Sequence, residues 1–276
     1  MISLWSDIVK QALAEDIGRG DITTNTLVGA ADKAEAVIVA KEDFVVCGLP
    51  VLAEVFREVD NRIRLLPEFH DGDGVRAGNT LCTIRGPARG ILIGERVALN
   101  FFQNLSAVAT LTTRFVAAVE GTGTKVFDTR KTTPGIRLLQ KYAVRVGGGY
   151  NHRMGLDDGM LVKENHIKLA GGITRAVRLL RETSAHMHRI EVECETLEQV
   201  REALDLGVDV IMLDNMDLDS LSRAVAMARG KALLEASGGI NLNNARSVAE
   251  TGVDMISIGA LTHSAGNKDV SLLITA

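Results

Sequence analysis

Apolar and polar residues follow several rhythms in the first part of the chain. Between Ile2 and Ala14 the apolar residues recur at helical spacing, which predicts a helix. From Glu35 to Arg85 the pattern is mostly that of strands and turns, with one helix near Pro50 to Val59. A long apolar helical pattern follows from Ile91 to Phe115. We therefore expect an α+β unit of mixed strands and helices at the N-terminal end.

The pattern then changes to a repeat of strand, loop and helix. The expected helices span Ile173–Ser184, Leu197–Leu206, Leu218–Ala228 and Asn243–Thr251. The short β-rich runs between and before them end near Asp128, Lys163, Glu193, Asp214, Ser237 and Gly259. This repeat predicts a parallel sheet, and an α/β barrel fits better than an open sheet because no GxGxxG loop opens the series. Six visible strands predict an incomplete barrel, and "DVSLLITA" at the end of the sequence predicts a further strand that returns to the first domain.

Charge is distributed unevenly along the 276 residues, whose formal net charge is −4. The segment from Lys125 to Lys168 contains nine Lys and Arg against four Asp and Glu, a local balance of +5. Aromatic residues make up only 4% of the chain, so the segment suits a small anion better than a nucleic acid. The alternative is a solvated basic face.

Cysteine usage and apolar runs bear on the expected compartment. Cys47, Cys82 and Cys194 are far apart and form no CxxC spacing, which predicts a reducing compartment and no zinc or iron–sulfur site. No apolar run reaches the roughly 18 residues of a membrane span, and the N-terminal segment lacks the basic start of a signal peptide. We therefore expect a cytoplasmic protein with no membrane or nucleic-acid partner.

The candidate chemistry gathers where the predicted strands end. In an α/β barrel the carboxyl ends of the strands meet at one mouth, so these polar residues are expected to converge. The alternative is that strand ends are polar only because loops begin there. Glu193 and Asp214 offer hard oxygen ligands that suit Mg²⁺. The "SGG" and "GAL" runs, at Ser237–Gly239 and Gly259–Leu261, offer backbone N–H groups that suit phosphate.

Basic residues supply the complement to these acids. Arg and Lys bind carboxylates and phosphates, and the candidates are Arg130, Lys131, His152, Arg153 and Lys163. The glycines at 147–149 give the backbone beside them unusual freedom. The residues alone thus predict a Mg²⁺-assisted enzyme that acts on a phosphorylated, multiply anionic small molecule.

Several segments, in order from residue 12 to residue 272, carry a closer resemblance. They are "ALAEDIGRGDITT", "GERVALNFFQNLSAVAT", "DTRKTTPGIRLLQKYAVRVGGGYNHRMGLDDGMLVKENHI", "IEVECETLEQ", "IMLDNM", "EASGGI" and "ISIGALTHSAGNKDVSL". With them the chain resembles the quinolinate phosphoribosyltransferase family, also called nicotinate-nucleotide pyrophosphorylase (carboxylating). The family more often has Asp where Glu164 stands.

The resemblance implies a two-domain fold and a reaction. Residues 1–100 would form an N-terminal α/β sandwich, to which 265–276 returns, and 101–264 an incomplete, seven-stranded α/β barrel. Quinolinate and phosphoribosyl pyrophosphate would give nicotinate mononucleotide, pyrophosphate and CO₂, a step of de novo NAD biosynthesis.

The resemblance also implies roles for individual residues. Lys131, Lys163, Glu193 and Asp214 would be catalytic, with Glu193 and Asp214 as the metal and ribose contacts. The quinolinate and pyrophosphate contacts would be Arg130, Lys131, His152, Arg153 and Lys163. The 5′-phosphate cradle would be Ser237, Gly238, Gly239, Gly259, Ala260 and Leu261. Thr129 and His263 complete the expected substrate-binding set.

Arg96 lies apart from this set, in the apolar run "ERVALNFFQNLSAVATL". A charge in such a run needs an anionic partner if it is buried. The alternatives are a local pair with Glu95 and solvent exposure at the helix edge. The resemblance implies that the partner subunit of a homodimer contributes Arg96 to the site.

Three other functions compete with this reaction. A related protein encoded with molybdate transporters shares the fold, but the unbroken basic motif argues against it. Nicotinate phosphoribosyltransferase acts without decarboxylation. A barrel that merely binds phosphorylated metabolites would not need Glu193 and Asp214.

Overall fold

The computed structural model describes residues 2–183 and 187–275, and it contains two compact units. The first unit takes its residues from 1–113, 132–148 and 262–276, and the second unit from 114–131 and 149–261. The boundary expected at residue 100 falls inside helix α4 (Ala88–Ala118), which continues from the first unit into the second. Residues 1 and 276 of the expected domains, and the expected helix end Ser184, lie outside the described residues.

The first unit contains a four-stranded sheet in the order β12-β1-β5-β3. Its ladders are antiparallel, and the C-terminal β12 pairs with β1, Ala40 opposite Val270. A second sheet pairs β2 with β4. The bounds are β1 (Lys33–Ala40), β2 (Phe44–Val45), β3 (Arg64–Pro67), β4 (Gly74–Val75), β5 (Thr80–Pro87) and β12 (Val270–Ile274).

Helices α1 (Ile2–Ile17), α2 (Ile22–Leu27), α3 (Leu49–Val59) and α5 (Arg137–Val146) also belong to the first unit. The first turn of α3 is stabilised by Asp71, whose carboxylate accepts hydrogen bonds from the backbone N–H groups of Gly48 and Leu49. Tyr142 on α5 donates its hydroxyl hydrogen to the same carboxylate at 2.7 Å. Asp71 therefore ties α5 to the start of α3.

Helix α5 divides the basic segment that looked continuous in the sequence. Leu139, Ala143 and Val144 form its buried face. The next turn is close-packed, because a side chain at Gly147 would meet the carbonyl oxygen of Ala109 at 2.5 Å. Of the three expected glycines, Gly148 adopts a positive φ of 86°. The basic residues of α5 thus belong to a structural helix of the first unit.

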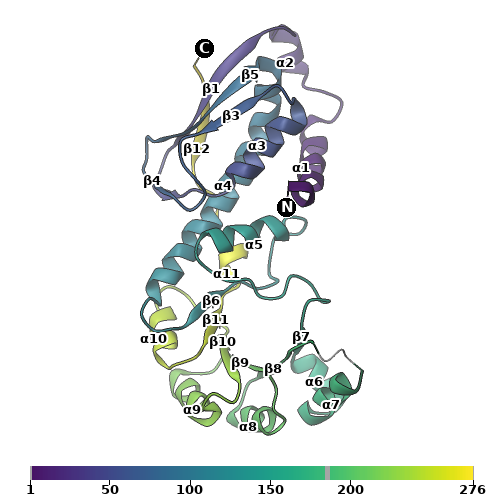
Figure 1. Ribbon diagram of the computed structural model, residues 1–276, viewed down its shortest axis with the longest axis vertical. Helices are drawn as coiled ribbons and strands as arrows, with labels where there is room; N and C mark the ends of the chain where they lie inside the picture. Colours follow the sequence, from purple (N-terminus) through teal and green to yellow (C-terminus); the bar gives the residue numbers. More distant parts are fainter. Residues whose placement is uncertain (1, 184–186, 276) are drawn as a thin grey trace. The chain divides into compact units, whose positions relative to one another are not determined.

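The second unit is a parallel sheet of six strands in the order β6-β11-β10-β9-β8-β7 (Figure 1). Its strands are β6 (Lys125–Phe127), β7 (Met160–Val162), β8 (Ile190–Cys194), β9 (Val210–Asp214), β10 (Leu233–Ser237) and β11 (Met255–Ser257). Its helices are α6 (Glu164–Ala170), α7 (Ile173–Thr183), α8 (Leu197–Asp205), α9 (Leu218–Ala228) and α10 (Ala245–Glu250), and the short α11 (Ala260–His263) leads back into the first unit.

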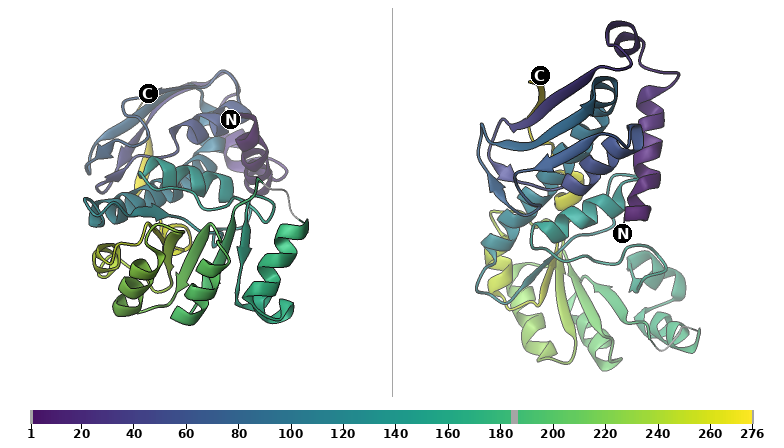
Figure 2. Two further views of the ribbon diagram at one scale, coloured as in Figure 1. Left: turned by 60° about the horizontal axis from the view of Figure 1, so that its bottom comes forward. Right: turned by 45° about the horizontal axis from the view of Figure 1, so that its top comes forward.

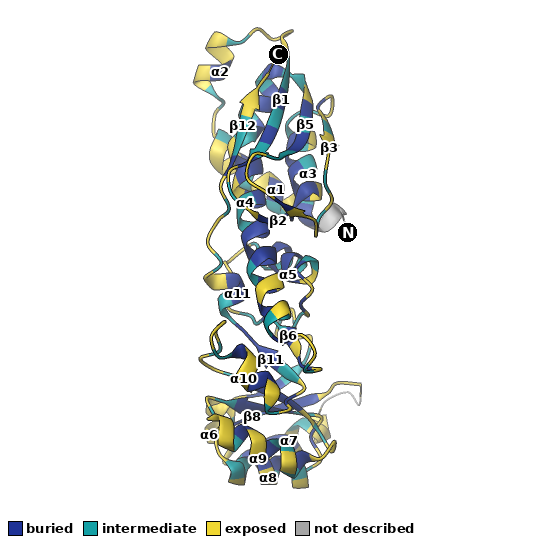
Figure 3. Ribbon diagram, turned by 90° about the vertical axis from the view of Figure 1, so that its left-hand side faces the viewer, coloured by how far each residue is buried: buried dark blue, intermediate teal, exposed yellow. Residues whose placement is uncertain are grey.

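The helices of the second unit lie along the outer face of its sheet (Figure 2). In α7, α8, α9 and α10 the outward sides are exposed and the inward sides are apolar and buried, as Ile173, Ala176 and Val177 are in α7, whereas α6 buries no residue (Figure 3). This separation follows from the apolar spacing of the sequence. Within the described residues no helix has the length and apolar character needed to cross a membrane.

The α/β class and the incomplete barrel are as expected, but the described sheet has six strands where the resemblance implied seven. Tyr150 takes the place of a further strand beside β6 with one isolated parallel bridge to Phe127. Its ring also stacks on that of Phe127, with centroids 5.4 Å apart. The residues after Tyr150 bond to the side chain of Asp128 instead of extending a ladder.

Candidate active site

The carboxyl ends of the parallel strands border a cavity of about 550 Å³ in the second unit. Most of the predicted site residues line it: Thr129, Arg130, Lys131, His152, Arg153, Lys163, Glu193, Asp214, Ser237, Gly238 and Gly239. Five further lining residues were not predicted: Leu161, Met212, Asn215, Glu235 and Ser257. The sheet thus brings together residues as far apart in the sequence as Thr129 and Ser257.

The remaining predicted residues do not line this cavity. Arg96 is an exposed residue of α4 in the first unit, and His263 is an exposed residue whose Nδ1 lies 2.6 Å from the Ser264 hydroxyl. Gly259 and Ala260 follow β11, and Leu261 is fully buried. The side chain of Leu261 is therefore part of the core, so any phosphate contact there would come from the backbone.

Asp128, expected among the groups at the mouth, is fully buried. Its carboxylate accepts hydrogen bonds from the backbone N–H of His152 at 2.8 Å and from the Asn151 side-chain amide at 2.6 Å. Asp128 is thus a structural acid that fixes the loop carrying His152 and Arg153.

The cations of the cavity are crowded. Arg153 donates from Nη1 to the carbonyl oxygen of Gly159 at 2.7 Å. Burial lowers the pKa of Arg153, the positive charge of Arg130 lowers it further, and Glu191 opposes both effects. Two guanidinium groups that repel each other in a partly buried position fit a ligand with more than one negative charge.

Two carboxylates face the same cavity from neighbouring strands. Glu193 on β8 accepts from Nζ of Lys163 at 3.0 Å. Burial raises the pKa of Asp214 on β9, Glu193 raises it further, and Asn215, Lys163 and Lys131 lower it. The two acids therefore repel each other across the cavity. A cation between the two carboxylates would offset this repulsion. Hard oxygen donors fit Mg²⁺, which prefers one or two carboxylates and retains several water ligands.

Asn215 was missed, although it directly follows Asp214. Its φ of 54° is in the left-handed region, which asparagine tolerates better than most residues. Its side-chain amide donates to Oδ2 of Asp214 at 2.7 Å, and its backbone N–H donates to the carbonyl oxygen of Ser237 at 2.9 Å. A side chain at Gly238, whose own φ is 92°, would overlap Oδ1 of Asn215. The two strand ends therefore fit together only with glycine at position 238.

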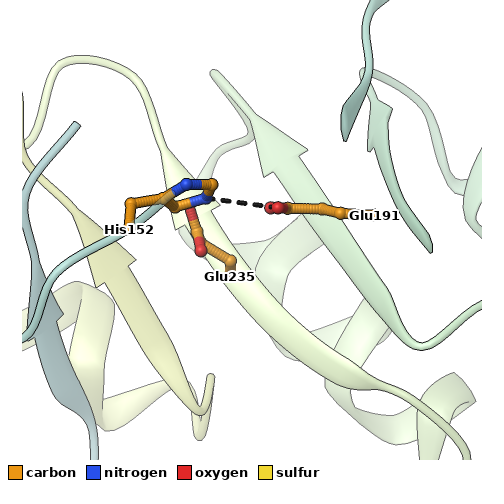
Figure 4. Close-up of side chains that lie close together, drawn as sticks. All are labelled: His152, Glu191 and Glu235. Carbon is orange, nitrogen blue, oxygen red and sulfur yellow. Dashed lines mark ion pairs between the residues drawn. The ribbon is translucent and has the colours of Figure 1, made fainter. Parts of the chain in front are cut away.

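A buried cluster of His152, Glu191 and Glu235 was missed as well (Figure 4). Nε2 of His152 lies 3.2 Å from Oε2 of Glu191 and 3.5 Å from Oε1 of Glu235. The sequence contained a signal for it. Residues two apart on a strand share a face, so Glu191 accompanies Glu193 on β8, and Glu235 accompanies Ser237 on β10.

Comparison with known proteins gives one family over nearly the whole chain. The model of the quinolinate phosphoribosyl transferase N-terminal domain matches residues 21–106, and that of the C-terminal domain matches residues 108–273. A Bacillus subtilis protein named probable nicotinate-nucleotide pyrophosphorylase [carboxylating] is 44% identical over 261 residues, which cover 95% of this chain and 90% of that protein.

Proteins of other organisms give the same result. A Nicotiana tabacum protein named quinolinate phosphoribosyltransferase [decarboxylating] 2b, mitochondrial, is 39% identical over 97% of this chain and 81% of its own length. The crystal structure of a nicotinate-nucleotide pyrophosphorylase from Ehrlichia chaffeensis superposes with a TM-score of 0.94 at 44% identity, covering 98% of both chains. Both domains and the order of the motifs thus lead to one conclusion: the chain belongs to the quinolinate phosphoribosyl transferase family.

Proposed function

We propose that this chain transfers the phosphoribosyl group of phosphoribosyl pyrophosphate to quinolinate, with loss of CO₂, giving nicotinate mononucleotide and pyrophosphate. The observation that carries the proposal is the cavity at the strand ends, where Arg130, Lys131, Arg153 and Lys163 face one space with Glu193 and Asp214. The named activity of the relatives supports the same reaction. The two substrates together carry two carboxylates, a phosphate and a pyrophosphate, and this cluster of fixed cations matches that charge.

The guanidinium groups are assigned to the dicarboxylate. Arg153 and Arg130 are close enough to affect each other's charge, so both can contact neighbouring carboxylates of one ring. His152 belongs to the same subsite, next to Arg153 in the loop that Asp128 fixes. A substrate with one carboxylate would leave one of these partly buried cations without its substrate partner, which is costly.

Glu193 and Asp214 are assigned to Mg²⁺ and to the ribose hydroxyls. Bound there, Mg²⁺ would supply positive charge next to the pyrophosphate oxygens. Lys131 and Lys163 stabilise the negative charge that develops on the departing pyrophosphate. The ribose C1′ takes on positive charge as its bond to pyrophosphate lengthens, and the pyridine nitrogen, held in place by its carboxylates, attacks it.

The turn after β10 is assigned to the 5′-phosphate. Ser237 offers a hydroxyl, and Gly238 and Gly239, both with positive φ, leave room for a phosphate to approach the backbone. Gly259, Ala260 and the backbone of Leu261 follow the adjacent strand β11 and complete this subsite in the proposal.

Arg96 is assigned to the site of the partner subunit in a homodimer. It is exposed on α4, and it makes no ion pair with any residue that the structure describes. An arginine in this position is available to an anion bound by another chain. The dimer would hold two equivalent sites because a two-fold interface is symmetric.

The test of the reaction is to follow both products with quinolinate and phosphoribosyl pyrophosphate as substrates. We expect one pyrophosphate and one CO₂ for each quinolinate consumed. Turnover of nicotinate without CO₂ would instead indicate the non-decarboxylating transferase. Tight binding of both substrates without pyrophosphate release would indicate a binding protein.

A further inference from the structure

Glu235 is a buried acid to which the reaction described so far gives no task. Its side chain is 2% exposed, yet it lines the cavity that holds the proposed catalytic residues. Its Oε1 is buried and has no hydrogen-bond partner among the residues that the structure describes. It precedes Ser237 by two positions on β10, so it faces the same side of the sheet at a deeper level.

The proposed reaction needs an acid in this cavity. When the carboxylate next to the ring nitrogen leaves as CO₂, its bonding electron pair remains on the ring carbon. The positive pyridinium nitrogen stabilises this pair, but the product forms only when the carbon takes up a proton. A carboxyl group that lines the cavity is placed to deliver this proton directly to the ring.

The other groups of the cavity already have assigned partners. The Arg and Lys side chains match the anionic groups of the two substrates, and Glu193 and Asp214 match the metal and the ribose. Among the carboxyl groups that line the cavity, Glu235 is left over.

We propose that Glu235 is the acid that protonates the ring carbon after CO₂ departs. In this step the O–H bond of the Glu235 carboxyl group breaks, and its electron pair stays on the oxygen. The proton forms a C–H bond with the pair that CO₂ left on the carbon. Water returns a proton to the carboxylate when the product has left. The inference rests on the proposed reaction and names a further group for its second half.

The surroundings of Glu235 favour its protonated form. Burial raises its pKa to about 7, and the charge of Glu191 on β8 is the second cause, while His152, Ser257 and Lys163 lower the pKa. Met212, its partner on β9, is uncharged. An acid whose pKa lies near the working pH can both hold and release a proton, which is what a proton donor requires.

His152 is placed to stabilise the carboxylate that the transfer leaves behind. Its Nδ1 accepts the backbone N–H of Arg153 at 2.9 Å, so its ring proton belongs on Nε2. That nitrogen faces Oε2 of Glu191 at 3.2 Å and Oε1 of Glu235 at 3.5 Å. The same loop therefore connects the proposed acid to the arginine of the dicarboxylate subsite.

The decisive experiment separates the two halves of the reaction in a single turnover of the Glu235→Gln enzyme, with carboxyl-labelled quinolinate. We expect pyrophosphate to form at close to the wild-type rate and CO₂ release to slow by about 10²–10⁴-fold, the usual contribution of a general acid. The dicarboxylated mononucleotide should accumulate between the two events. Glu235→Asp, which keeps the acid but shortens it, should restore part of the CO₂ release.

Three outcomes would overturn the proposal. The first is that Glu235→Gln releases CO₂ at the wild-type rate. The second is that pyrophosphate formation and CO₂ release slow by the same factor in Glu235→Gln. The third is that wild type contains a stoichiometric transition metal that Glu235→Gln lacks. The metal must be measured because the ligand atoms of His152, Glu191 and Glu235 all lie within 4.8 Å of one another. The matched control is Glu250→Gln, which alters an exposed acid paired with Arg246 on α10. If Glu235→Gln does not fold, Glu235→Asp alone tests the proposal. CO₂ release from Glu235→Asp at the wild-type rate would then count against the proposal.

Discussion

Glu54 in the first unit and Glu235 in the second unit are both buried, and they have opposite surroundings. Glu54 in the first unit is 5% exposed and accepts two hydrogen bonds from Arg57, at 2.8 Å from Nε and 2.5 Å from Nη2. Glu235 in the second unit faces another buried acid, Glu191, and its Oε1 has no hydrogen bond among the described residues. A buried carboxylate normally has hydrogen-bond partners for its oxygens, so the one with an unsatisfied oxygen beside a second acid indicates a functional position.

The same contrast holds for whole strands. The buried positions of β1 in the first unit are Ala36, Ile38 and Ala40, and these serve packing alone. The corresponding inward positions of β8 and β10 include three acids. On this comparison the buried glutamate of the first unit is structural and the inward-facing acids of β8 and β10 in the second unit serve the reaction, and substitutions in both units can test that division.

Replacement of Arg96 is expected to have the largest effect. It would break the division between the units, because a residue of the first unit would then be essential for the reaction. Arg96→Ala and Lys131→Ala homodimers should each be nearly inactive. After subunit exchange, half of the dimers are mixed and hold one intact site of two, so about one quarter of wild-type activity should return. Activity measured after mixing, with exchange verified by mass spectrometry, checks this. No recovery would place both residues in the site of one chain.

Removal of the metal comes next. Because Glu193 and Asp214 repel each other, we expect them to need a divalent cation, and excess chelator should abolish turnover. Asp214→Asn should raise the Mg²⁺ concentration needed for half-maximal activity. Isothermal titration of Mg²⁺ in the presence of phosphoribosyl pyrophosphate gives a readout that does not depend on turnover. Full activity in chelator would contradict the assignment.

Arg153→Ala should weaken quinolinate binding by roughly 2–5 kcal/mol, because it leaves a substrate carboxylate buried without its cation. Binding of phosphoribosyl pyrophosphate should change much less. Nicotinate, with one carboxylate, should bind poorly to the wild-type protein. Calorimetry that finds nicotinate and quinolinate equally tight would show that no paired-cation subsite exists.

A smaller effect is expected at Asn215, which joins the ends of β9 and β10. Asn215→Gly keeps the left-handed backbone but loses the amide that holds Asp214, so the KM for phosphoribosyl pyrophosphate should rise several-fold. Asn215→Asp keeps the shape and places a negative charge beside Asp214, so its effect should be larger. Steady-state kinetics on the two variants decide whether the amide or only the backbone shape matters. A wild-type KM for phosphoribosyl pyrophosphate in both variants would show that Asn215 has no role in the site.

The smallest effects are expected on stability, and they compare Glu54 and Glu235 directly. Between pH 4.5, the ordinary pKa of a glutamate, and about 7, folded Glu235 keeps a proton that the unfolded chain loses, so wild-type stability falls as pH rises through this window. Glu235→Gln should therefore become more stable than wild type, by about 3 kcal/mol at pH 8. Glu54→Gln should be less stable by about 1 kcal/mol, because it weakens a hydrogen-bonded ion pair. Thermal unfolding from pH 5 to pH 8 checks both signs.

Much of this division could be predicted from the sequence, because strand ends are marked by a change from apolar to polar residues. That signal alone was enough to place Lys163, Glu193, Asp214 and Ser237 at one edge of a parallel sheet. It failed for Asp128, because a polar residue at a strand end can point into the protein as well as into a cavity. Exposure and direction are properties of the packed sheet.

Other features needed the three-dimensional structure for different reasons. The apolar spacing of Leu139, Ala143 and Val144 is that of a helix, but the charges around it pointed to ligand binding instead. The period of two in "IEVEC" places Glu191 on the face of Glu193, yet only the parallel register brings Glu235 and His152 beside it. The single bridge of Tyr150 could not be foreseen, because a strand and a bridge differ only in the bonds of the next residues.

The pairing of β12 with β1 has a consequence for the order in which the chain folds during synthesis. The second unit is complete at residue 261, whereas the sheet of the first unit still lacks its edge strand β12, which the ribosome makes later. Until then β1 presents a row of unpaired backbone N–H and C=O groups, the kind of edge that joins other nascent chains. We expect the parallel sheet to mature first on the ribosome, and truncation before Val270 to yield a protein that aggregates through β1 although its catalytic cavity is fully encoded.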